Sequence, residues 1–191
     1  AVFEDPRSTI HIEDAKTFLS TQGRRYDIIV SEPSNPWVSG VASLFTEEFY
    51  RHAQRNLEQD GILVQWIQLY EIDMTLVTSI MRAMTVVFDD YAVFDVDHSN
   101  ILVVARKGRG VGNPSPHVFD APALRAELRR IGILNAADIA ERRIGGKRLL
   151  DPLFRAQGAP ANSDYFPFVD VNAVRARFMR ADAQEFAELA M

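Results

Sequence analysis

Short runs of hydrophobic residues recur along the first hundred positions and set out the predicted strands. Residues Ser8–Glu13 alternate between polar and apolar, with Ile10 and Ile12 on one side, and predict a short strand. The runs Tyr26–Val30 and Ile62–Trp66 are apolar apart from Asp27 and Gln65. Continuous runs of this length are typical of strands that are buried on both faces of a parallel sheet.

Helical patterns separate these strands. Asp14, Thr46 and Asp73 each precede a stretch with helical periodicity. All three are predicted N-caps, because their side-chain oxygens accept hydrogen bonds from the first turn of a helix. We expect the helix after Thr46 to end near 60–61, where an Asp-Gly pair stands. Strands that alternate with helices indicate an α/β doubly wound sheet.

The remaining pattern divides the chain into three predicted parts. Residues 92–96 and 100–105 predict an antiparallel hairpin that completes a domain over 1–106. A glycine- and proline-containing linker follows at 107–117. Helical periodicity dominates 118–191, which we therefore expect to be a helical carboxyl-terminal extension.

Composition narrows the class of protein. The chain has 191 residues, 47% of them hydrophobic, a net charge of -5 and no cysteine. A disulfide framework, a zinc finger and a thiol nucleophile are excluded. No apolar run approaches the ~20 residues of a membrane span, and no signal peptide is visible, so we expect a cytoplasmic protein. Acidic residues outnumber basic ones in 1–100, which argues against nucleic acid as a partner.

The segment after the run Tyr26–Val30 holds the main candidate chemistry. Glu32 follows this strand closely, and ligands of parallel sheets bind at the carboxyl ends of strands. A carboxylate there, held between prolines, could accept a proton or bind an amine. The alternative is a loop glutamate that caps a turn or faces solvent. Asn35 and Trp37 could complete a pocket wall, although a tryptophan after proline also suits simple packing.

A second set of candidates follows the next strand. Gln65 stands near its end, and Tyr70 and Glu71 follow in the loop. A glutamine in this position either faces a ligand or satisfies buried backbone groups, and the sequence supports both interpretations equally.

Two other patterns predict no site. The glycines of Gly108–Gly112 follow a strand, but prolines come next, so no helix N-terminus is expected there to meet a phosphate. The four histidines lack metal-ligand spacing and stand in different elements, so no metal site is predicted.

These blocks, taken in order, resemble a known family. The sequences DPR, EDA, YDIIVSEPSNPW, SLFTEEFY and DGILVQW are similar to those of spermidine synthases, the polyamine aminopropyltransferases. The likeness is strongest for a bacterial spermidine-synthase-like branch that is often attached to membrane segments, and it covers about 4–106. The tail at 162–167 resembles the end of longer relatives. The resemblance implies a Rossmann-like fold of the S-adenosylmethionine-dependent methyltransferase type and a role in polyamine biosynthesis.

The resemblance also implies roles for single residues. Asp14, with Ala15 beside it, matches the position that meets the adenine of decarboxylated S-adenosylmethionine or S-adenosylmethionine, a substrate rather than a tightly bound cofactor. Glu32 matches the aspartate that takes the proton of the acceptor amine. Asn35 matches a second aspartate that holds this amine, and Gln65 matches a glutamine after the next strand. Tyr70 joins the predicted substrate-binding residues from its place in the loop after that strand.

The same resemblance bears on what this chain does alone. In the family, the glycine-rich loop and two strands precede the region matched here, so we expect an amino-terminally truncated form of the fold. The strand at Tyr26–Val30 is then expected to pair with Ser8–Glu13 or with another copy of the chain. Two hypotheses follow. One is a transferase whose parent is active and whose 191 residues alone are inactive or very weak. The other is a non-catalytic association module. The resemblance implies a homodimer.

Overall fold

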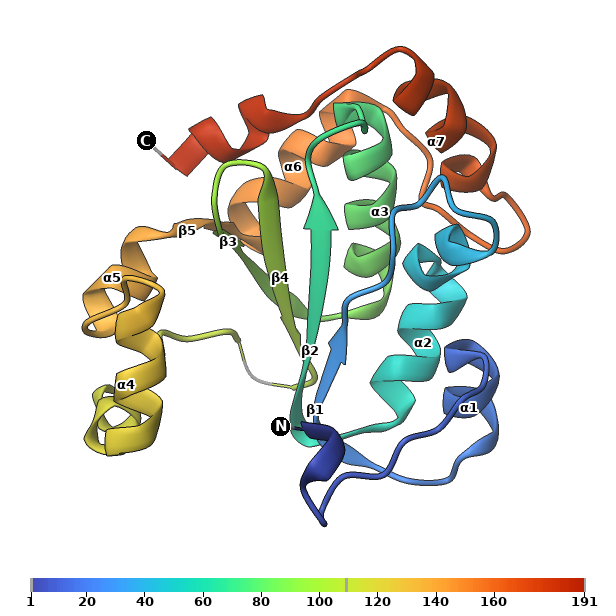
Figure 1. The fold of residues 1–191 in the computed structure, drawn as a ribbon. Coiled ribbons are helices and arrows are strands. Elements are labelled where there is room, and N and C mark those ends of the chain that lie inside the picture. Colours follow the sequence, from blue (N-terminus) through green and yellow to red (C-terminus); the bar gives the residue numbers. More distant parts are fainter. Residues whose placement is uncertain (1, 109, 191) are drawn as a thin grey trace.

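Five strands form one mixed sheet in the order β1-β2-β4-β3-β5 (Figure 1). The structure is a computed structural model and describes residues 2–108 and 110–190. The strands are β1 (Tyr26–Ser31), β2 (Leu57–Gln68), β3 (Asp90–Asp95), β4 (Asn100–Arg106) and β5 (Arg143–Gly146). The α-helices are α1 (Ala15–Thr21), α2 (Glu47–Arg55), α3 (Met74–Val87), α4 (Pro122–Arg130), α5 (Ala136–Glu141), α6 (Lys147–Gln157) and α7 (Phe168–Phe178). Short 3-10 helices are η1 (Val2–Glu4), η2 (Val41–Phe45), η3 (Pro116–Asp120) and η4 (Gln184–Ala190).

The strand pairing confirms the α/β prediction and the hairpin. Strands β1 and β2 run parallel, with Ser31 opposite Gln65 at their carboxyl ends. Strands β3 and β4 form the predicted antiparallel hairpin, and β4 joins it to β2. The three predicted caps are also confirmed. Asp14, Thr46 and Asp73 accept backbone N–H groups from the first turns of α1, α2 and α3.

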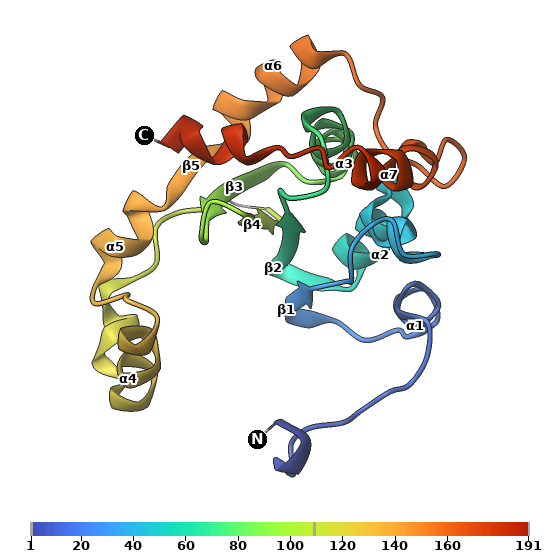
Figure 2. The same cartoon turned by 45° about the horizontal axis from the view of Figure 1, so that its top comes forward.

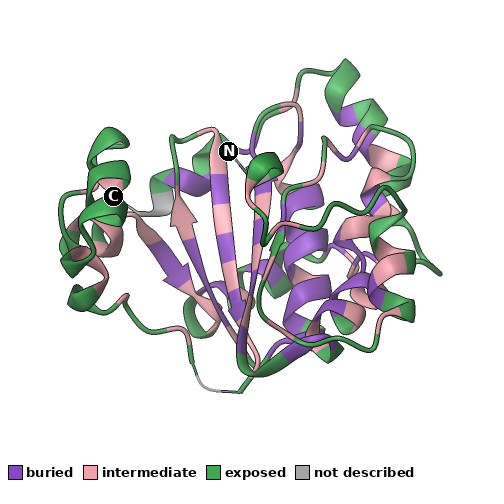
Figure 3. Cartoon of the chain, turned by 60° about the horizontal axis from the view of Figure 1, so that its bottom comes forward, coloured by how far each residue is buried: buried purple, intermediate pink, exposed green. Residues whose placement is uncertain are grey.

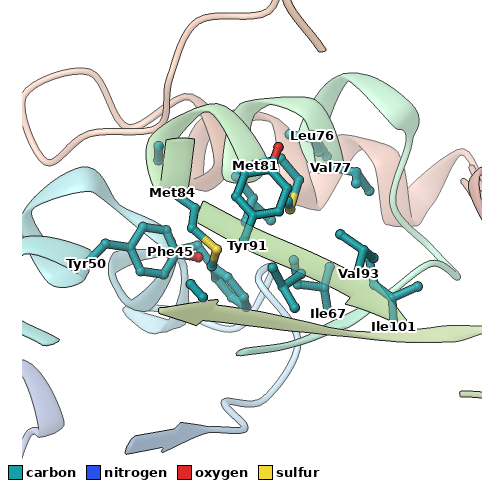
Figure 4. Close-up of a cluster of buried hydrophobic side chains, with 14 of the residues drawn as sticks. Phe45, Tyr50, Ile67, Leu76, Val77, Met81, Met84, Tyr91, Val93 and Ile101 are labelled. Carbon is teal, nitrogen blue, oxygen red and sulfur yellow. The ribbon is translucent and has the colours of Figure 1, made fainter. Parts of the chain in front are cut away.

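One face of the sheet carries the hydrophobic core. Helices α2, α3 and α7 lie together on the same side of β1 and β2 (Figure 2). Side chains of η2, α2, α3 and the strands meet between the layers (Figure 4). Each of the following is at most 1% exposed: Phe45, Tyr50, Ile67, Leu76, Val77, Met81, Met84, Tyr91, Val93 and Ile101. The alternate residues of β2 and β4 point into this core, as the two-residue period of a strand requires.

The other face of the sheet is apolar but largely open. Buried and half-buried positions alternate along β2 and β4 (Figure 3), and the half-buried set faces away from the core. It includes Val64, Trp66 and Val104. On β1, the side chains of Ile28 and Val30 are 58% and 66% exposed. The expectation that β1 is buried on both faces is therefore wrong for this chain.

The predicted strand at Ser8–Glu13 is also wrong. This stretch has no strand pairing, and Ile12 is 99% exposed. An alternating pattern becomes a strand only when a neighbouring strand satisfies its backbone groups, and this stretch runs apart from the sheet. Strand β1 is consequently an edge strand, and its predicted pairing with Ser8–Glu13 does not occur.

The region 118–191 is mostly helical and is tied to the rest of the chain at several points. Helices α4 and α5 project from one side (Figure 2). Strand β5, which the sequence did not predict, pairs with β3 and extends the sheet. Helix α6 packs against α3, and α7 packs against α3 and η2. Among the described helices, none is both long and apolar enough to cross a membrane.

Candidate functional site

The carboxyl ends of β1 and β2 lie at the same edge of the sheet, and the predicted catalytic residue follows the first of them. Glu32 is the first residue beyond β1, and its side chain is exposed. Pro33 and Pro36 stand in the loop that follows and keep it out of a helix. The structure thus places a solvent-facing carboxylate where parallel sheets usually bind ligands.

A cavity of about 360 Å³ opens beside Glu32, between β1 and α1. Ala15 and Glu32, which are far apart in the sequence, both line it. Its walls are mostly apolar, with charged groups from Glu13 and Glu32 and the His11 ring at the rim. The lining residues are His11, Glu13, Ala15, Phe18, Leu19, Ile29, Val30, Ser31, Glu32, Pro33, Leu44 and Phe49. A pocket of this kind suits a largely apolar group that carries a few polar atoms.

Asp14 stands next to this cavity but uses its carboxylate to cap α1. Its Oδ1 accepts the backbone N–H of Thr17 at 2.7 Å. This hydrogen bond lowers the pKa of Asp14 below its ordinary value. Asp14 is therefore ionised at neutral pH and is held at the start of α1, immediately before Ala15 in the cavity wall.

Gln65 lies below the strand ends rather than in the cavity wall. It is fully buried, and its Nε2 donates to the Ser31 carbonyl at 3.3 Å and to the Trp66 carbonyl at 3.0 Å. Its Oε1 has no hydrogen-bond partner among the described residues. Of the two interpretations that the sequence left open, the structure shows contacts of the backbone-satisfying kind. Gln65 thereby holds the carbonyl that immediately precedes Glu32.

Asn35 and Tyr70 belong to the two loops beyond β1 and β2, outside the lining of this cavity. The carbonyl of Asn35 accepts the backbone N–H of Val38 at 2.9 Å, which closes a turn. Tyr70 forms an isolated antiparallel bridge with Asp182, and its side chain is 36% exposed. The described structure therefore brings Ala15 and Glu32 into one cavity and leaves Asn35 and Tyr70 outside its lining, in the loops after β1 and β2.

Sequence reasoning missed two groups of residues near the site. His11 lines the cavity, and its ring lies 4.8 Å from the ring of Phe18. The alternating pattern around His11 suggested a strand and concealed this role. On the rim, the guanidinium of Arg177 lies 5.1 Å from the ring centroid of Trp37. No local pattern signals this second contact, because it joins segments that are distant in sequence.

The tail of the chain fixes the helices that surround the cavity, mainly through one asparagine. Asn162 is fully buried, and its Nδ2 donates to the carbonyls of Phe45 at 3.1 Å and Ala42 at 3.4 Å. Its Oδ1 accepts the N–H of Val169 at 3.0 Å. The side chain therefore connects η2 to the start of α7.

The residues after Asn162 extend this connection to α1. The carboxylate of Glu48 accepts hydrogen bonds from Ser163 Oγ at 2.9 Å and from the N–H of Asp164 at 2.8 Å. Asp164 in turn forms an ion pair with Lys16, which follows Ala15. The cavity is thus held by contacts from both halves of the sequence. Among the described residues, no cluster of three His, Cys, Asp or Glu could hold a metal ion.

A mixed α/β sheet with a parallel strand pair and a cavity beside the carboxyl end of β1 is typical of Rossmann-like domains. The comparisons with known proteins give the family. A model of the spermine/spermidine synthase domain matches residues 1–97, and the chain belongs to that family. The fold is accordingly the methyltransferase-like Rossmann fold of spermidine synthases.

Individual relatives agree with this assignment. The chain is 34% identical over 119 residues to a polyamine aminopropyltransferase of Synechococcus sp., covering 60% of this chain and 38% of that protein. It is 43% identical over 61 residues to one of Alkaliphilus oremlandii, covering 32% of this chain and 21% of that protein. The chain thus spans well under half the length of these relatives. A probable spermidine synthase structure from Corynebacterium glutamicum shares the fold, with a TM-score of 0.57 and 20% identity over 84% of this chain and 55% of that one.

Proposed function

We propose that this chain supplies the catalytic edge of a spermidine-synthase-like transferase, which moves an aminopropyl group from an adenosyl sulfonium donor to an amine. The observation that carries the proposal is the cavity in which Ala15 and Glu32 meet. Family membership supports the same reaction class. The donor of an aminopropyl group is decarboxylated S-adenosylmethionine. With S-adenosylmethionine as the alternative donor, the group transferred would be its 3-amino-3-carboxypropyl group.

The proposed reaction balances as a single displacement. The amine nitrogen of the acceptor forms a bond to the aminopropyl carbon that the donor carries on its sulfonium. The bond between this carbon and sulfur breaks, its electron pair returns to sulfur, and neutral methylthioadenosine leaves. The acceptor nitrogen loses one proton, which Glu32 takes as general base. The negative charge of Glu32 also favours the cationic donor in the ground state.

The other predicted residues receive matching roles in this proposal. Ala15 contributes to the wall around the adenine. Asp14 would accept a hydrogen bond from the amino group of the adenine while still capping α1. Asn35 and Tyr70 contact the amine from the rim. Gln65 would not touch the substrate. It would position Glu32 indirectly, because its amide donates a hydrogen bond to the carbonyl of Ser31, the residue before Glu32. The protein would act in the cytoplasm, and we expect these 191 residues on their own to turn over slowly or not at all.

Calorimetric titration of the chain tests this proposal. We expect micromolar binding of decarboxylated S-adenosylmethionine or methylthioadenosine if the cavity takes an adenosyl group. In a protein that turns over, Glu32→Gln should retain this binding and lower the transfer rate by roughly 10²–10⁴-fold. Glu58→Gln, a change at an exposed glutamate of β2, is the matched control. The absence of heat with every adenosyl ligand would overturn the proposal for this chain.

The second candidate is a non-catalytic association module, and the open edge of β1 favours it. An unpaired strand edge that carries exposed Ile28 and Val30 is a template for pairing with another chain. We infer that the chain forms a homodimer through this edge. Analytical ultracentrifugation should show a dimer that Ile28→Lys converts to a monomer. A chain that stays monomeric at high micromolar concentration would contradict this inference.

A further inference from the structure

Three side chains from separate segments form a small cluster where the loops that follow β1 and β2 meet the end of α7. The guanidinium carbon of Arg177, at the end of α7, lies 5.1 Å from the centre of the Trp37 ring. Arg177 Nε lies 3.7 Å from Oε2 of Glu71. Trp37 belongs to the loop after β1, and Glu71 belongs to the loop after β2. Both loops extend from the edge of the sheet at which Glu32 lies.

An aromatic face beside a carboxylate is a recognition set for an organic cation. The ring attracts a positive charge through its quadrupole, and the carboxylate supplies the opposite charge. In this structure the cation is the chain's own Arg177. The same two groups would accept an alkylammonium of a ligand, which has the same charge and a smaller volume.

We propose that Trp37 and Glu71 form a subsite for the alkylammonium group of the acceptor, and that Arg177 occupies this subsite until the amine displaces it. The proposal rests on the proposed transferase function and names the chemical class of its acceptor end, a primary aliphatic amine in its cationic form. Arg177 is then an internal competitor of the substrate.

The contacts of Arg177 are of the kind that a ligand can replace. Its side chain is 55% exposed, and that of Glu71 is 40% exposed. Arg177 makes no side-chain hydrogen bond to any of the described residues, and its ion pair at 3.7 Å is long. By contrast, Arg155 donates a hydrogen bond to Asp151 at 2.8 Å within α6. An exposed pair without a hydrogen bond contributes little to stability, so it separates at low cost.

The backbone of the loop that carries Glu71 is held by several contacts. Glu71 has a positive φ of 53°, a left-handed conformation that non-glycine residues adopt only when their surroundings impose it. Its neighbours in the loop are held by the tail, because the N–H of Ala183 donates to the carbonyl of Leu69 at 2.7 Å and Tyr70 pairs with Asp182. The backbone that carries the Glu71 carboxylate therefore keeps its place when Arg177 leaves.

Trp37 offers a direct readout of this exchange. The chain contains two tryptophans, so Trp66→Phe leaves Trp37 as the single indole fluorophore. In that background the chain would be titrated with 1,4-diaminobutane, with n-butylamine and with uncharged 1-butanol. We expect both amines to shift the emission of Trp37 and 1-butanol to leave it unchanged.

Removal of the internal competitor gives the decisive comparison. Arg177→Ala should bind both amines about 2- to 5-fold more tightly than the parent, the range that a cation–π contact at an exposed site allows. Arg175→Ala removes another exposed arginine of α7 and should bind them as the parent does. Glu71→Gln in the Arg177→Ala chain should weaken the binding again. Circular dichroism and Tm would confirm that all variants fold.

Two outcomes would overturn the proposal. One is equal amine affinity for Arg177→Ala and Arg175→Ala. The other is a Trp37 emission that does not respond to millimolar amine once Arg177 is absent. Neither outcome depends on the adenosyl donor, so a failure of this subsite is distinct from a failure of the donor titrations. If the donors do not bind but the amines do, the transferase function falls and the cation subsite remains.

Discussion

The two faces of the sheet have similar side chains but different surroundings. On one face, Ile101 and Val103 of β4 are completely buried beneath the helices. On the other face, Leu102 and Val104 of the same strand line an open apolar groove of about 500 Å³ beside α4 and α5. Hydrophobic residues thus fill both faces, although the described structure covers only one of them. Side chains on the covered face therefore stabilise the fold, and those on the open face are available for association.

The difference shows what a continuous apolar run indicates. Such a run predicts that both faces of a strand need a covering layer, but it does not predict which molecule provides that layer. Apolar side chains that stay exposed together on one face are typical of an interaction surface. Strand β1 is the clearest case, because Ile28 and Val30 are exposed while Ser31 at its end is buried.

The sharpest test of the comparison uses neighbouring residues of β4. Ile101→Ala opens a cavity in the packed core and should lower the free energy of unfolding by about 2–5 kcal/mol. Leu102→Ala, on the open face, should cost less than about 1.5 kcal/mol, because its side chain is already partly hydrated. Urea denaturation of both variants measures the difference. Equal losses would mean that the open face is covered in solution.

The next largest effect concerns Asn162, whose side chain joins η2 to α7 on the covered face of the sheet. Asn162→Ala removes three side-chain hydrogen bonds and leaves the carbonyl of Phe45 and the N–H of Val169 without these partners. We expect a loss of about 2–4 kcal/mol in unfolding free energy. Asn172→Ala, which removes one hydrogen bond within α7, is the control and should lose about 1 kcal/mol. Similar losses in the two variants would argue against the fastening role of Asn162.

A pH titration tests whether water is excluded from the buried core around Tyr91. Burial raises the pKa of Tyr91 to about 12, because its hydroxyl loses the solvation that the phenolate needs. The folded pKa lies above the ordinary value of about 10, so the stabilisation is complete below pH 10 and is lost as the pH rises through 12. We expect a loss of about 2–3 kcal/mol over this interval, and Tyr91→Phe should make the loss smaller by that amount. Thermal unfolding between pH 9 and 12 would detect it.

The smallest expected effect lies at the cavity itself. Asp14→Ala removes the cap of α1 and should destabilise the chain by about 1 kcal/mol. Asp14→Asn keeps an acceptor at the cap and should recover most of this loss. If Asp14 also meets the adenine, both variants should weaken binding of methylthioadenosine in calorimetry. A loss of stability without a loss of affinity would restrict Asp14 to capping.

Local signals in the sequence were sufficient for part of the fold. The caps at Asp14, Thr46 and Asp73 follow from hydrogen bonds within four residues, so their positions could be predicted. The hairpin of β3 and β4 follows from two apolar runs around a short turn. Glu32 was placed beyond β1 for a similar reason, since the end of a strand and the start of its loop are both local.

Predictions failed where a distant segment decides the outcome. The helix after Thr46 was expected to continue to 60–61, but β2 begins at Leu57 and includes both residues. There Gly61 passes so close to β1 that a Cβ would lie 2.9 Å from the carbonyl of Tyr26. Strand β5 and the contact of Arg177 with Trp37 likewise depend on partners elsewhere in the chain. The hydrogen bond of Gln65 to the carbonyl of Ser31 could not be predicted either, because it joins two different strands.

The bridge between Tyr70 and Asp182 also bears on how the protein is made. It joins the loop after β2 to a segment near the end of the chain. During synthesis, the first strands leave the ribosome long before this segment exists, and the entropy of closing so long a loop opposes the contact. The rim of the site therefore takes its final shape only after almost the whole chain has been translated. A ribosome that stops before Asp182 would release a chain that retains both parallel strands. That chain would lack the bridge to Asp182 that holds the loop of Tyr70 and Glu71.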